Sequence, residues 1–343
     1  MVERVVTFIV PAYNSEKYLD KCLSSFLCPK ALDEIEIIVV NDGSQDGTAR
    51  IAEAYVAQYP DSFVLINKEN GGHGSGVNIA AQRARGRYLR VVDSDDWVQT
   101  ENLREYVESL RNASADAVVT NFHKVDAVTG RKIPIATSGV RFCRIYSLDE
   151  VMEVGKGALN CCMIHGLAYR TAFYLDCKIT LSEGISYEDQ EYSTIIFAKA
   201  NAILFLDLFL YEYLVGTASQ SVSDGNQVKR ASQLEQVFWK IAEAYKNGEK
   251  LSTSAKKYFL YKLAETLQNY YVTMFIRNDD RAAGRVEAER LRRESSEILP
   301  DLKAATNFRY RLLYLMHILR IRPRHLETLK KSPLYLWLRR TIR

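Results

Sequence analysis

The sequence has little of what zinc-binding, secreted and membrane-spanning proteins need. Its 343 residues include six cysteines, none in a C-x-x-C pair, and five histidines without the close spacing of a zinc site. We expect the cysteines, at positions 22, 28, 143, 161, 162 and 177, to be reduced. No apolar run reaches the roughly 18 residues of a membrane span, and the first residues carry no cleavable signal pattern. These absences favour a cytoplasmic protein.

The sequence also lacks the glycine signatures of common nucleotide-binding folds. The first expected strand runs into PAYN at 11–14, where a dehydrogenase has G-x-G-x-x-G, and the glycine run at 71–76 has no GK[ST] of a P-loop. An NAD-dependent dehydrogenase is therefore disfavoured. The composition, 47% hydrophobic and 26% charged, is that of an ordinary globular protein with one large or two moderate domains.

Three aspartates in four residues are the most informative feature present. Asp93, Asp95 and Asp96 directly follow a buried strand expected over 88–92. Such close carboxylates repel one another, and a hard cation such as Mg²⁺ or Mn²⁺ removes that repulsion while keeping positions for phosphate oxygens. The alternative is a solvated turn whose aspartates cap the helix starting near Thr100. These residues alone leave both interpretations open.

Strands and helices alternate along the first part of the chain. Strands are expected over 5–10, 35–40, 63–67, 88–92 and 117–122, with helices between them. This alternation is typical of β-α-β units and of an α/β fold with a mostly parallel sheet. Ligands bind such sheets outside the carboxyl ends of the strands. Asn14, Asp42, Asn70 and residues 93–96 all fall there, which predicts a site at that edge.

The later part of the chain is less regular. A hairpin is expected over 124–145, a helix from Leu148, a strand over 163–169, a helix from Glu188 to Ala200 and a strand over 202–206. From about residue 226 the pattern is helical only. The sequence therefore predicts an α/β domain over 1–225 and a helical C-terminal region over 226–343.

Five motifs, in this order and spacing, resemble those of an inverting family-2 glycosyltransferase with the GT-A, Rossmann-like fold, of the type that builds bacterial polysaccharides and glycans. They are VPAYN at 10–14, NDGSQDGT at 41–48, NGGHGSGVN at 70–78, DSDDW at 93–97 and YED at 187–189. The resemblance implies transfer of a sugar from a nucleotide-diphosphate donor, with UDP expected, to an acceptor hydroxyl with inversion. It also implies a Mn²⁺ or Mg²⁺ cofactor and a glycan or lipid-linked acceptor.

The resemblance assigns roles residue by residue. It gives Asp42 to the nucleotide base, Asp93 and Asp95 to the metal, and Asp189, with Glu188 beside it, to the catalytic base. A base is needed because the attacking hydroxyl, with its high pKa, must lose a proton. The expected donor-binding residues are Pro11, Ala12, Tyr13, Asn14, Asp42, Asn70, Gly71, Gly72, His73, Asn78, Asp93 and Ser94.

Several of these assignments have a plainer alternative. Glu188 and Asp189 are also typical of first-turn acids that complement a helix dipole. His73 is either a pocket residue or an ordinary loop residue. The family often carries a positive charge in the segment that closes over the diphosphate, expected here at 211–223, yet residues 216–221 contain none. Two other functions stay open: a non-catalytic sugar-nucleotide or glycan-binding protein, and a sugar-phosphate nucleotidyltransferase, which would release pyrophosphate.

The last 42 residues differ in charge from the rest. Residues 302–343 contain eleven Lys or Arg and one acid, Glu327, whereas residues 1–301 contain 35 basic and 41 acidic residues. Basic residues interleaved with leucine and aromatic residues favour an anionic membrane surface, here the inner face of the cell membrane. The alternative is a helix packed on the body of the protein. No nucleic-acid motif is present, and no nucleic-acid partner is expected. The sugar, the acceptor, the linkage and the oligomeric state are not determined by the sequence.

Overall fold

The computed structural model describes residues 3–216, 224–248 and 251–321. The chain divides into two compact units, residues 1–218 with 243–259, and residues 219–242 with 260–343. Helices α10, Ala231–Asn247, and α11, Thr253–Val272, contribute residues to both units. The domain boundary near 225 stays a prediction.

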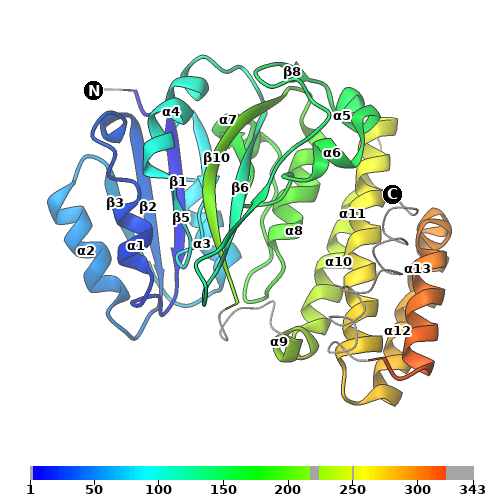
Figure 1. Ribbon diagram of the computed structural model, residues 1–343. Helices are drawn as coiled ribbons and strands as arrows, with labels where there is room; N and C mark the ends of the chain where they lie inside the picture. The colour runs from blue at the N-terminus through cyan, green and yellow to red at the C-terminus, as the bar shows by residue number, and fades with distance from the viewer. Residues whose placement is uncertain (1–2, 217–223, 249–250, 322–343) are drawn as a thin grey trace. The chain divides into compact units, whose positions relative to one another are not determined.

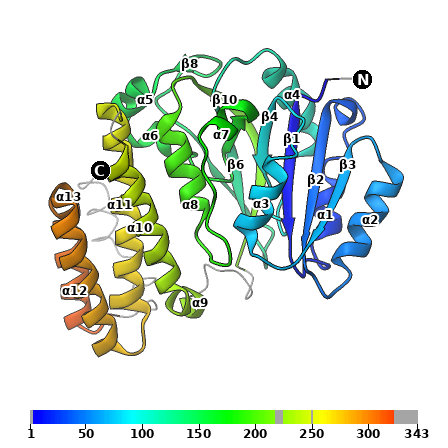
Figure 2. The same ribbon diagram turned by 180° about the vertical axis from the view of Figure 1, so that it is seen from behind.

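The first unit is built on one sheet, to which the described residues contribute ten strands in the order β3-β2-β1-β4-β9-β6-β10-β5, with β7 paired to β6 and β8 to β10. The strands are β1 Val6–Ala12, β2 Ile35–Asp42, β3 Phe63–Lys68, β4 Tyr88–Val91, β5 Trp97–Val98, β6 Ala117–Asp126, β7 Lys132–Ile135, β8 Ile145–Tyr146, β9 Leu167–Arg170 and β10 Ile203–Val215. Helices α1 and α4 lie on one face (Figure 1), and α3 and α8 lie on the other (Figure 2). The predicted α/β class is confirmed.

Strands β3, β2, β1 and β4 are parallel to one another, as the β-α-β pattern predicts. Every residue of β1 and of β2 is buried, because helices cover both faces of this half. In the other half, β9 is antiparallel to β4 and to β6, and β10 is parallel to β6 and antiparallel to β5. The carboxyl ends of the four parallel strands therefore share one edge of the sheet.

The first strand continues past Pro11, where the sequence predicts that it ends. Pro11 pairs with Val40, and β1 extends to Ala12. The carbonyl of Ile9 accepts a hydrogen bond from Val92 N at 2.8 Å, so odd-numbered residues of β1 direct their backbone groups toward β4. Pro11 is odd-numbered, so its backbone also faces the side of β4. The pairing with β4 ends at Ile9, before Pro11 is reached. Its missing N–H therefore interrupts no ladder.

β10 is the largest departure from the sequence prediction. A strand is expected over 202–206 and a closing segment over 211–223, but β10 continues to Val215, so residues 211–215 belong to the sheet. Its pairing with β6 shifts register at Phe209, and such bulges bend a strand without ending it. Because the bulge interrupts the alternation of side chains between the two faces, the sequence pattern does not show that the strand continues. Residues 217–223, which hold most of the predicted closing segment, lie outside the described residues.

The described residues of the first unit contain the six predicted helices in their predicted order and two that the sequence does not predict, over 156–159 and 171–176. They are α1 Leu19–Ser24, α2 Thr48–Gln58, α3 His73–Ala81, α4 Leu103–Arg111, α5 Leu148–Val154, α6 Lys156–Leu159, α7 Thr171–Asp176 and α8 Asp189–Glu191, with 3-10 turns at Leu32–Glu34 and Thr100–Asn102.

The helix expected from Glu188 to Ala200 is irregular. After α8 comes a π-helical turn, Tyr192–Ile196, and then a 3-10 turn, Phe197–Lys199. Tyr169 Oη donates to Tyr192 O at 2.9 Å, and Tyr258 Oη donates to Ser193 O at 2.7 Å. These side chains supply bonds to carbonyls that a regular helix satisfies internally, which accounts for the wide turn.

Phe8→Ala is expected to lower the free energy of unfolding by about 3–5 kcal/mol, because it removes a fully buried ring from the middle of the sheet. The Phe8 ring lies 4.8 Å from that of Phe26 and 6.3 Å from that of Tyr106. Urea unfolding measures the loss. Tyr13→Ala, at an exposed position just after the same strand, is the control and should change the free energy by less than about 1 kcal/mol. A Phe8→Ala loss as small as the control would contradict this account of the core.

The second unit is helical throughout its described residues, as predicted. Besides its parts of α10 and α11 it contains α9 Asp224–Lys229, a π-helical turn Thr273–Arg277, α12 Arg281–Ile298 and α13 Pro300–Ile318. Arg290 of α12 ion-pairs with Glu235 of α10 at 2.6 Å and with Glu294 at 2.8 Å. In the part of the chain that the structure describes, no helix has the length and apolar character to cross a membrane.

Candidate functional site

The loops after β1 and β2 are joined by hydrogen bonds. Asn14 N donates to Ser44 Oγ at 3.0 Å, and Gln45 N donates to Asn14 Oδ1 at 2.9 Å. Asn14 has φ = 48°, in the left-handed region that asparagine tolerates. Tyr13, next to it, leaves 51% of its surface exposed. The carboxyl end of β1 therefore presents an aromatic ring to solvent.

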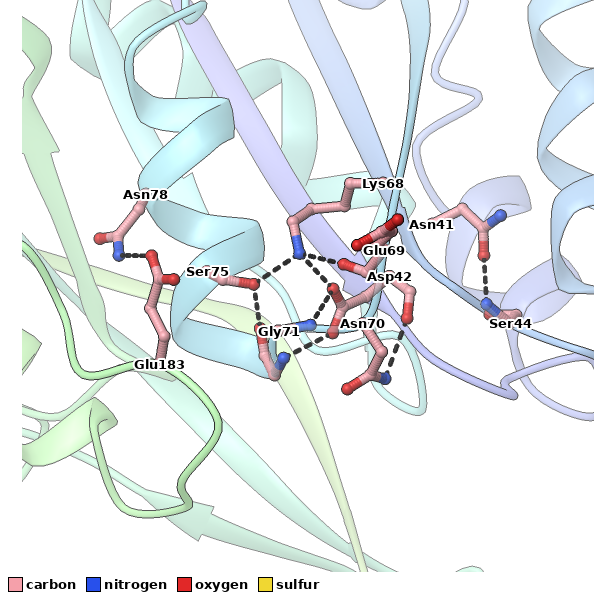
Figure 3. A network of polar contacts seen from close by, with 11 residues as sticks. Asn41, Asp42, Ser44, Lys68, Glu69, Asn70, Gly71, Ser75, Asn78 and Glu183 are labelled. Carbon is pink, nitrogen blue, oxygen red and sulfur yellow. Dashed lines mark hydrogen bonds and ion pairs between the residues drawn. The ribbon is translucent and has the colours of Figure 1, made fainter.

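Asp42, the last residue of β2, is held by three donors (Figure 3). Its Oδ1 accepts hydrogen bonds from Lys68 Nζ at 2.6 Å and from Gly71 N at 2.9 Å, and its Oδ2 accepts one from Gly72 N at 2.8 Å. Asn70 Nδ2 donates to the main-chain carbonyl of Asp42 at 3.0 Å. The carboxylate is buried, and the Lys68 charge offsets its desolvation. A carboxylate oxygen accepts two hydrogen bonds, so Oδ2 keeps capacity for a ligand.

The glycine run after β3 brings two loops into contact. Gly72 has φ = 85°, and a Cβ at this position would lie 2.9 Å from Gly184 N. Gly184 N also donates to Gly71 O at 2.6 Å. The amide hydrogens of Gly71 and Gly72 are directed at Asp42, so these two amides cradle an internal carboxylate. Contact of either glycine with the donor stays a prediction.

His73, the first residue of α3, bridges two carboxylates from distant parts of the chain. Its Nδ1 lies 2.6 Å from Glu188 Oε1, and its Nε2 lies 2.9 Å from Asp93 Oδ1. Burial opposes a charge here, but the hydrogen bonds to Asp93 and Glu188 and their charges raise the pKa of His73 well above its usual value. Burial likewise opposes ionisation of Asp93, yet the hydrogen bond and charge of His73 lower the pKa of that carboxyl. An imidazolium thus holds the two carboxylates together.

Asp93, Asp96 and His165 form the group best suited to a metal among the described residues, with one ligand atom of each within 4.8 Å of the others. His165 Nε2 lies 4.0 Å from Asp93 Oδ2, too far for a hydrogen bond. Metal bonds of about 2.0–2.2 Å place two ligand atoms of one ion roughly 3–4.4 Å apart. Burial lowers the pKa of His165 to about 4, so the ring is neutral and keeps a lone pair for coordination. These three residues fit a divalent cation.

Asp96 is buried against β10. Its Oδ2 accepts a hydrogen bond from Tyr211 Oη at 2.7 Å, and its Oδ1 accepts one from Leu214 N at 2.7 Å. Burial and the charges of Asp93 and Asp95 raise the pKa of Asp96 well above its usual value. A bound cation would reverse this effect by favouring the ionised form. Asp95 is not a member of the three-residue group, and its role as a metal ligand stays a prediction.

Ser94, the remaining residue of the motif expected at the donor, is buried and joined to the first loop. Its Oγ lies 2.7 Å from Ser15 Oγ. This contact ties the aspartate loop to the end of β1, so Ser94 has a structural role here. Its predicted contact with the donor is untested.

The segment before α8 is anchored on α3. Asn78 Nδ2 donates to Glu183 Oε1 at 2.9 Å (Figure 3). It also donates to Leu181 O at 3.0 Å, and Leu181 N donates to Asn78 Oδ1 at 2.9 Å. Glu188 is buried and engaged by His73, whereas Asp189, the first residue of α8, is partly exposed. Of the two predicted catalytic residues, Asp189 is the more accessible to a substrate.

Tyr213 of β10 lies beside His165. Its ring stacks on His165 with centroids 4.0 Å apart. Burial raises the pKa of Tyr213, and the nearby charges of Asp96, Asp93, Asp189 and Asp95 raise it further, in that order. Tyr213 therefore lies within the negative field of these carboxylates.

Comparison with known proteins identifies the family. The glycosyl transferase family 2 profile matches residues 7–173, which include the motifs at 10–14, 41–48, 70–78 and 93–97. The uncharacterized glycosyltransferase EpsJ of Bacillus subtilis is 29% identical over 210 residues, 61% of this chain and 60% of EpsJ. The chain belongs to glycosyltransferase family 2. The family match ends before residues 187–189, so Asp189 as the base stays a prediction.

This family 2 member also resembles TarS, the poly(ribitol-phosphate) β-N-acetylglucosaminyltransferase of Staphylococcus aureus strain Mu50. It is 30% identical to TarS over 254 residues, 70% of this chain and 42% of TarS. The chain therefore matches three fifths of EpsJ and two fifths of TarS, less than the whole of either relative.

Solved structures confirm the GT-A fold of this family 2 member. The crystal structure of S. aureus TarS 1–349 superposes with a TM-score of 0.61 at 23% identity over 91% of both chains, and its complex with UDP-GlcNAc gives 0.56 at 21% over 92% of both. A mannosyltransferase from Pyrobaculum calidifontis, in complex with GDP-Man and Mn²⁺, gives 0.51 at 16% identity, covering 91% of this chain and 86% of that one.

Sequence reasoning missed three residues of the site in this family 2 member. Lys68 is the last residue of β3 and pairs with Asp42. Its position at the carboxyl end of a predicted strand could have marked it as a candidate site residue. His165 lies just before β9 and Tyr213 lies in β10, and none of the five sequence motifs contains either residue. Only the sheet order, with β9 beside β4 and β10 two strands further along, brings them to the aspartates.

Proposed function

We propose that this chain transfers a sugar from a UDP-sugar to an acceptor hydroxyl with inversion of the anomeric carbon. One observation carries the proposal: His73 bridges Glu188, the residue beside the predicted base Asp189, and Asp93, a predicted metal ligand, with contacts of 2.6 and 2.9 Å. This bridge ties the aspartate loop to the segment that carries Asp189. The UDP-GlcNAc complex of TarS, a protein of the same fold, favours UDP as the nucleotide.

The proposed chemistry is a single displacement. The carboxylate of Asp189 accepts the proton of the acceptor hydroxyl while that oxygen attacks the anomeric carbon. The bond between this carbon and the diphosphate oxygen breaks, and the nucleoside diphosphate leaves. One displacement with one base inverts the anomeric centre, as it does in inverting glycosidases. Glu188 acts as a positioning residue, since His73 already holds its carboxylate.

The nucleotide is proposed to bind at the ends of β1 and β2. Asp42 Oδ2 has capacity to accept a hydrogen bond from the base, and the exposed ring of Tyr13 offers a surface on which the base can stack. Pro11, Ala12, Asn14, Asn70 and Asn78 shape the walls of this edge as proposed contacts. The ion pair with Lys68 holds the Asp42 carboxylate in place.

The metal is proposed to be Mn²⁺, held by Asp93 with Asp96 and His165. An imidazole ligand favours Mn²⁺ over Mg²⁺, which prefers oxygen ligands. The bound cation would stabilise the negative charge that develops on the leaving diphosphate. The resemblance predicts Asp93 with Asp95 instead, and the two ligand sets differ in a testable way.

The acceptor is proposed to be a glycan or lipid-linked glycan of the cell surface, reached from the cytoplasm. TarS is named for poly(ribitol-phosphate), which shows that a relative acts on a hydroxyl-bearing polymer.

A thermal-shift screen of UDP, GDP and ADP, and of UDP- and GDP-sugars, with Mn²⁺ or with EDTA, tests the proposal. UDP-sugars with Mn²⁺ should raise the melting temperature, since a ligand at 100 times its Kd adds about 2.7 kcal/mol to the stability of the folded state. With acceptor present, the released product should be UDP. Release of pyrophosphate from UTP would indicate a nucleotidyltransferase, and binding without any turnover would indicate a non-catalytic binding protein.

A further inference from the structure

Helix α13 has two apolar faces, and the other described residues cover one of them. Leu302, Leu313 and His317 are buried, and His317 Nδ1 lies 3.1 Å from Phe275 O of the π-helical turn. Tyr310 packs edge-on against the Phe275 ring, with centroids 5.5 Å apart. This inward face is therefore already covered within the second unit.

The second apolar face of α13 is exposed. Phe308, Leu312, Leu315 and Leu319 leave 66%, 46%, 51% and 63% of their surfaces accessible. Their spacing of four, three and four residues places them within a sector of about 60° at 3.6 residues per turn. They form one continuous stripe along three turns, here called the α13 stripe.

Such a stripe needs a covering surface. A helix that is apolar all round is normally buried, and a contiguous exposed apolar patch marks an interaction site. The α13 stripe differs from a scattered surface leucine because its four members succeed one another on a single face.

Positive charges flank the stripe on both sides. Arg311 lies on one side and Arg309 on the other, and Arg320 follows the end of the helix; all three are exposed. After Asp301 the helix contains no acidic residue. A stripe of large apolar residues bordered by arginines is typical of a helix that lies in the interface of a bilayer, with arginine side chains reaching the headgroups.

The same charges disfavour two other ways of burying the α13 stripe, by a second copy of the chain or by residues 322–343. A second copy packed stripe to stripe would bring Arg309, Arg311 and Arg320 against their own equivalents. Residues 322–343, which lie outside the described residues, carry seven Lys or Arg and one acid, so covering the stripe with them would also place like charges together. An anionic lipid surface complements both the apolar stripe and its flanks.

We propose that the α13 stripe docks this protein on a membrane surface rich in anionic phospholipid. The helix lies parallel to the surface, its four apolar side chains enter the headgroup and acyl boundary, and its arginines pair with lipid phosphates. This inference concerns the second unit alone and stands whether or not the proposed sugar transfer is correct.

Flotation of the full chain with vesicles tests it. Vesicles of phosphatidylcholine with 30% phosphatidylglycerol are compared with vesicles of phosphatidylcholine alone. The wild-type chain should float with the anionic vesicles only, and rising NaCl should weaken binding. The variant L312S/L315S should reduce the bound fraction at least about tenfold, because it removes two apolar anchors from the stripe.

The matched control is V286S. Val286 is an aliphatic residue on α12 that is 59% exposed, outside the stripe, so its replacement should leave vesicle binding unchanged. A second variant, R311Q/R320Q, should keep the fold and lower the salt sensitivity of binding. Circular dichroism and melting temperature establish that each variant is folded.

Three results would overturn the proposal. In the first, the wild-type chain fails to float with anionic vesicles. In the second, folded L312S/L315S floats as well as the wild type. In the third, light scattering shows that L312S/L315S turns an oligomer into a monomer while vesicle binding is unchanged, which would make the stripe an interface between copies.

Discussion

Asp189→Asn is expected to lower the rate of sugar transfer by about 10²- to 10⁴-fold, the usual contribution of a general base. Asparagine has nearly the same shape but cannot take the proton from the acceptor hydroxyl. Asp189 is partly exposed beside the buried Glu188, so the substitution should leave the fold intact. The affinity for UDP should change by less than about twofold, because Asp189 is not among the residues proposed to bind the nucleotide. UDP release and UDP titration calorimetry measure the two quantities.

Asp176→Asn is the matched control for this prediction. Asp176 is an exposed acid at the end of α7, and its replacement removes one negative charge from the same unit. Its transfer rate should equal that of the wild type. Transfer by Asp189→Asn at the wild-type rate would exclude Asp189 as the base.

Asp93→Asn is expected to weaken Mn²⁺ binding by at least about 100-fold and to abolish the part of UDP binding that depends on Mn²⁺. Loss of an outer-shell partner already costs about 10- to 100-fold in metal affinity, and a direct ligand costs at least as much. The neutral amide also removes the negative charge that faces His73 and His165. The electron paramagnetic resonance signal of free Mn²⁺ measures binding without any assay of transfer.

Two companion variants separate the candidate metal ligands. His165→Gln should weaken Mn²⁺ binding if the cation lies among Asp93, Asp96 and His165, whereas Asp95→Asn should do so if the family pattern holds. Asp33→Asn, an exposed acid in the turn before β2, is the control and should bind Mn²⁺ like the wild type. Undiminished Mn²⁺ binding by Asp93→Asn would place the cation elsewhere or remove it from the mechanism.

The parallel half of the sheet could be predicted because its signal is local. β1 and β2 are nearly continuous apolar runs, which is the pattern of strands covered on both faces. β10 could not be predicted at its full length, since its register shifts at Phe209 break the alternation along the sequence. The helix after Glu188 was expected to be regular, but Tyr169 and Tyr258 alter its backbone from outside.

The sequence by itself determined that carboxylates follow consecutive strands, and the β-α-β rule then placed Asp42 and Asp93 on one edge without knowledge of any contact. Only the tertiary structure decided which side chains pair with these carboxylates. Lys68 pairs with Asp42, His73 bridges Asp93 and Glu188, and His165 approaches Asp93 from the turn before β9. The physical reason is that strand propensity and apolar spacing act between neighbours in the chain, whereas ion pairing acts between groups that are close in space.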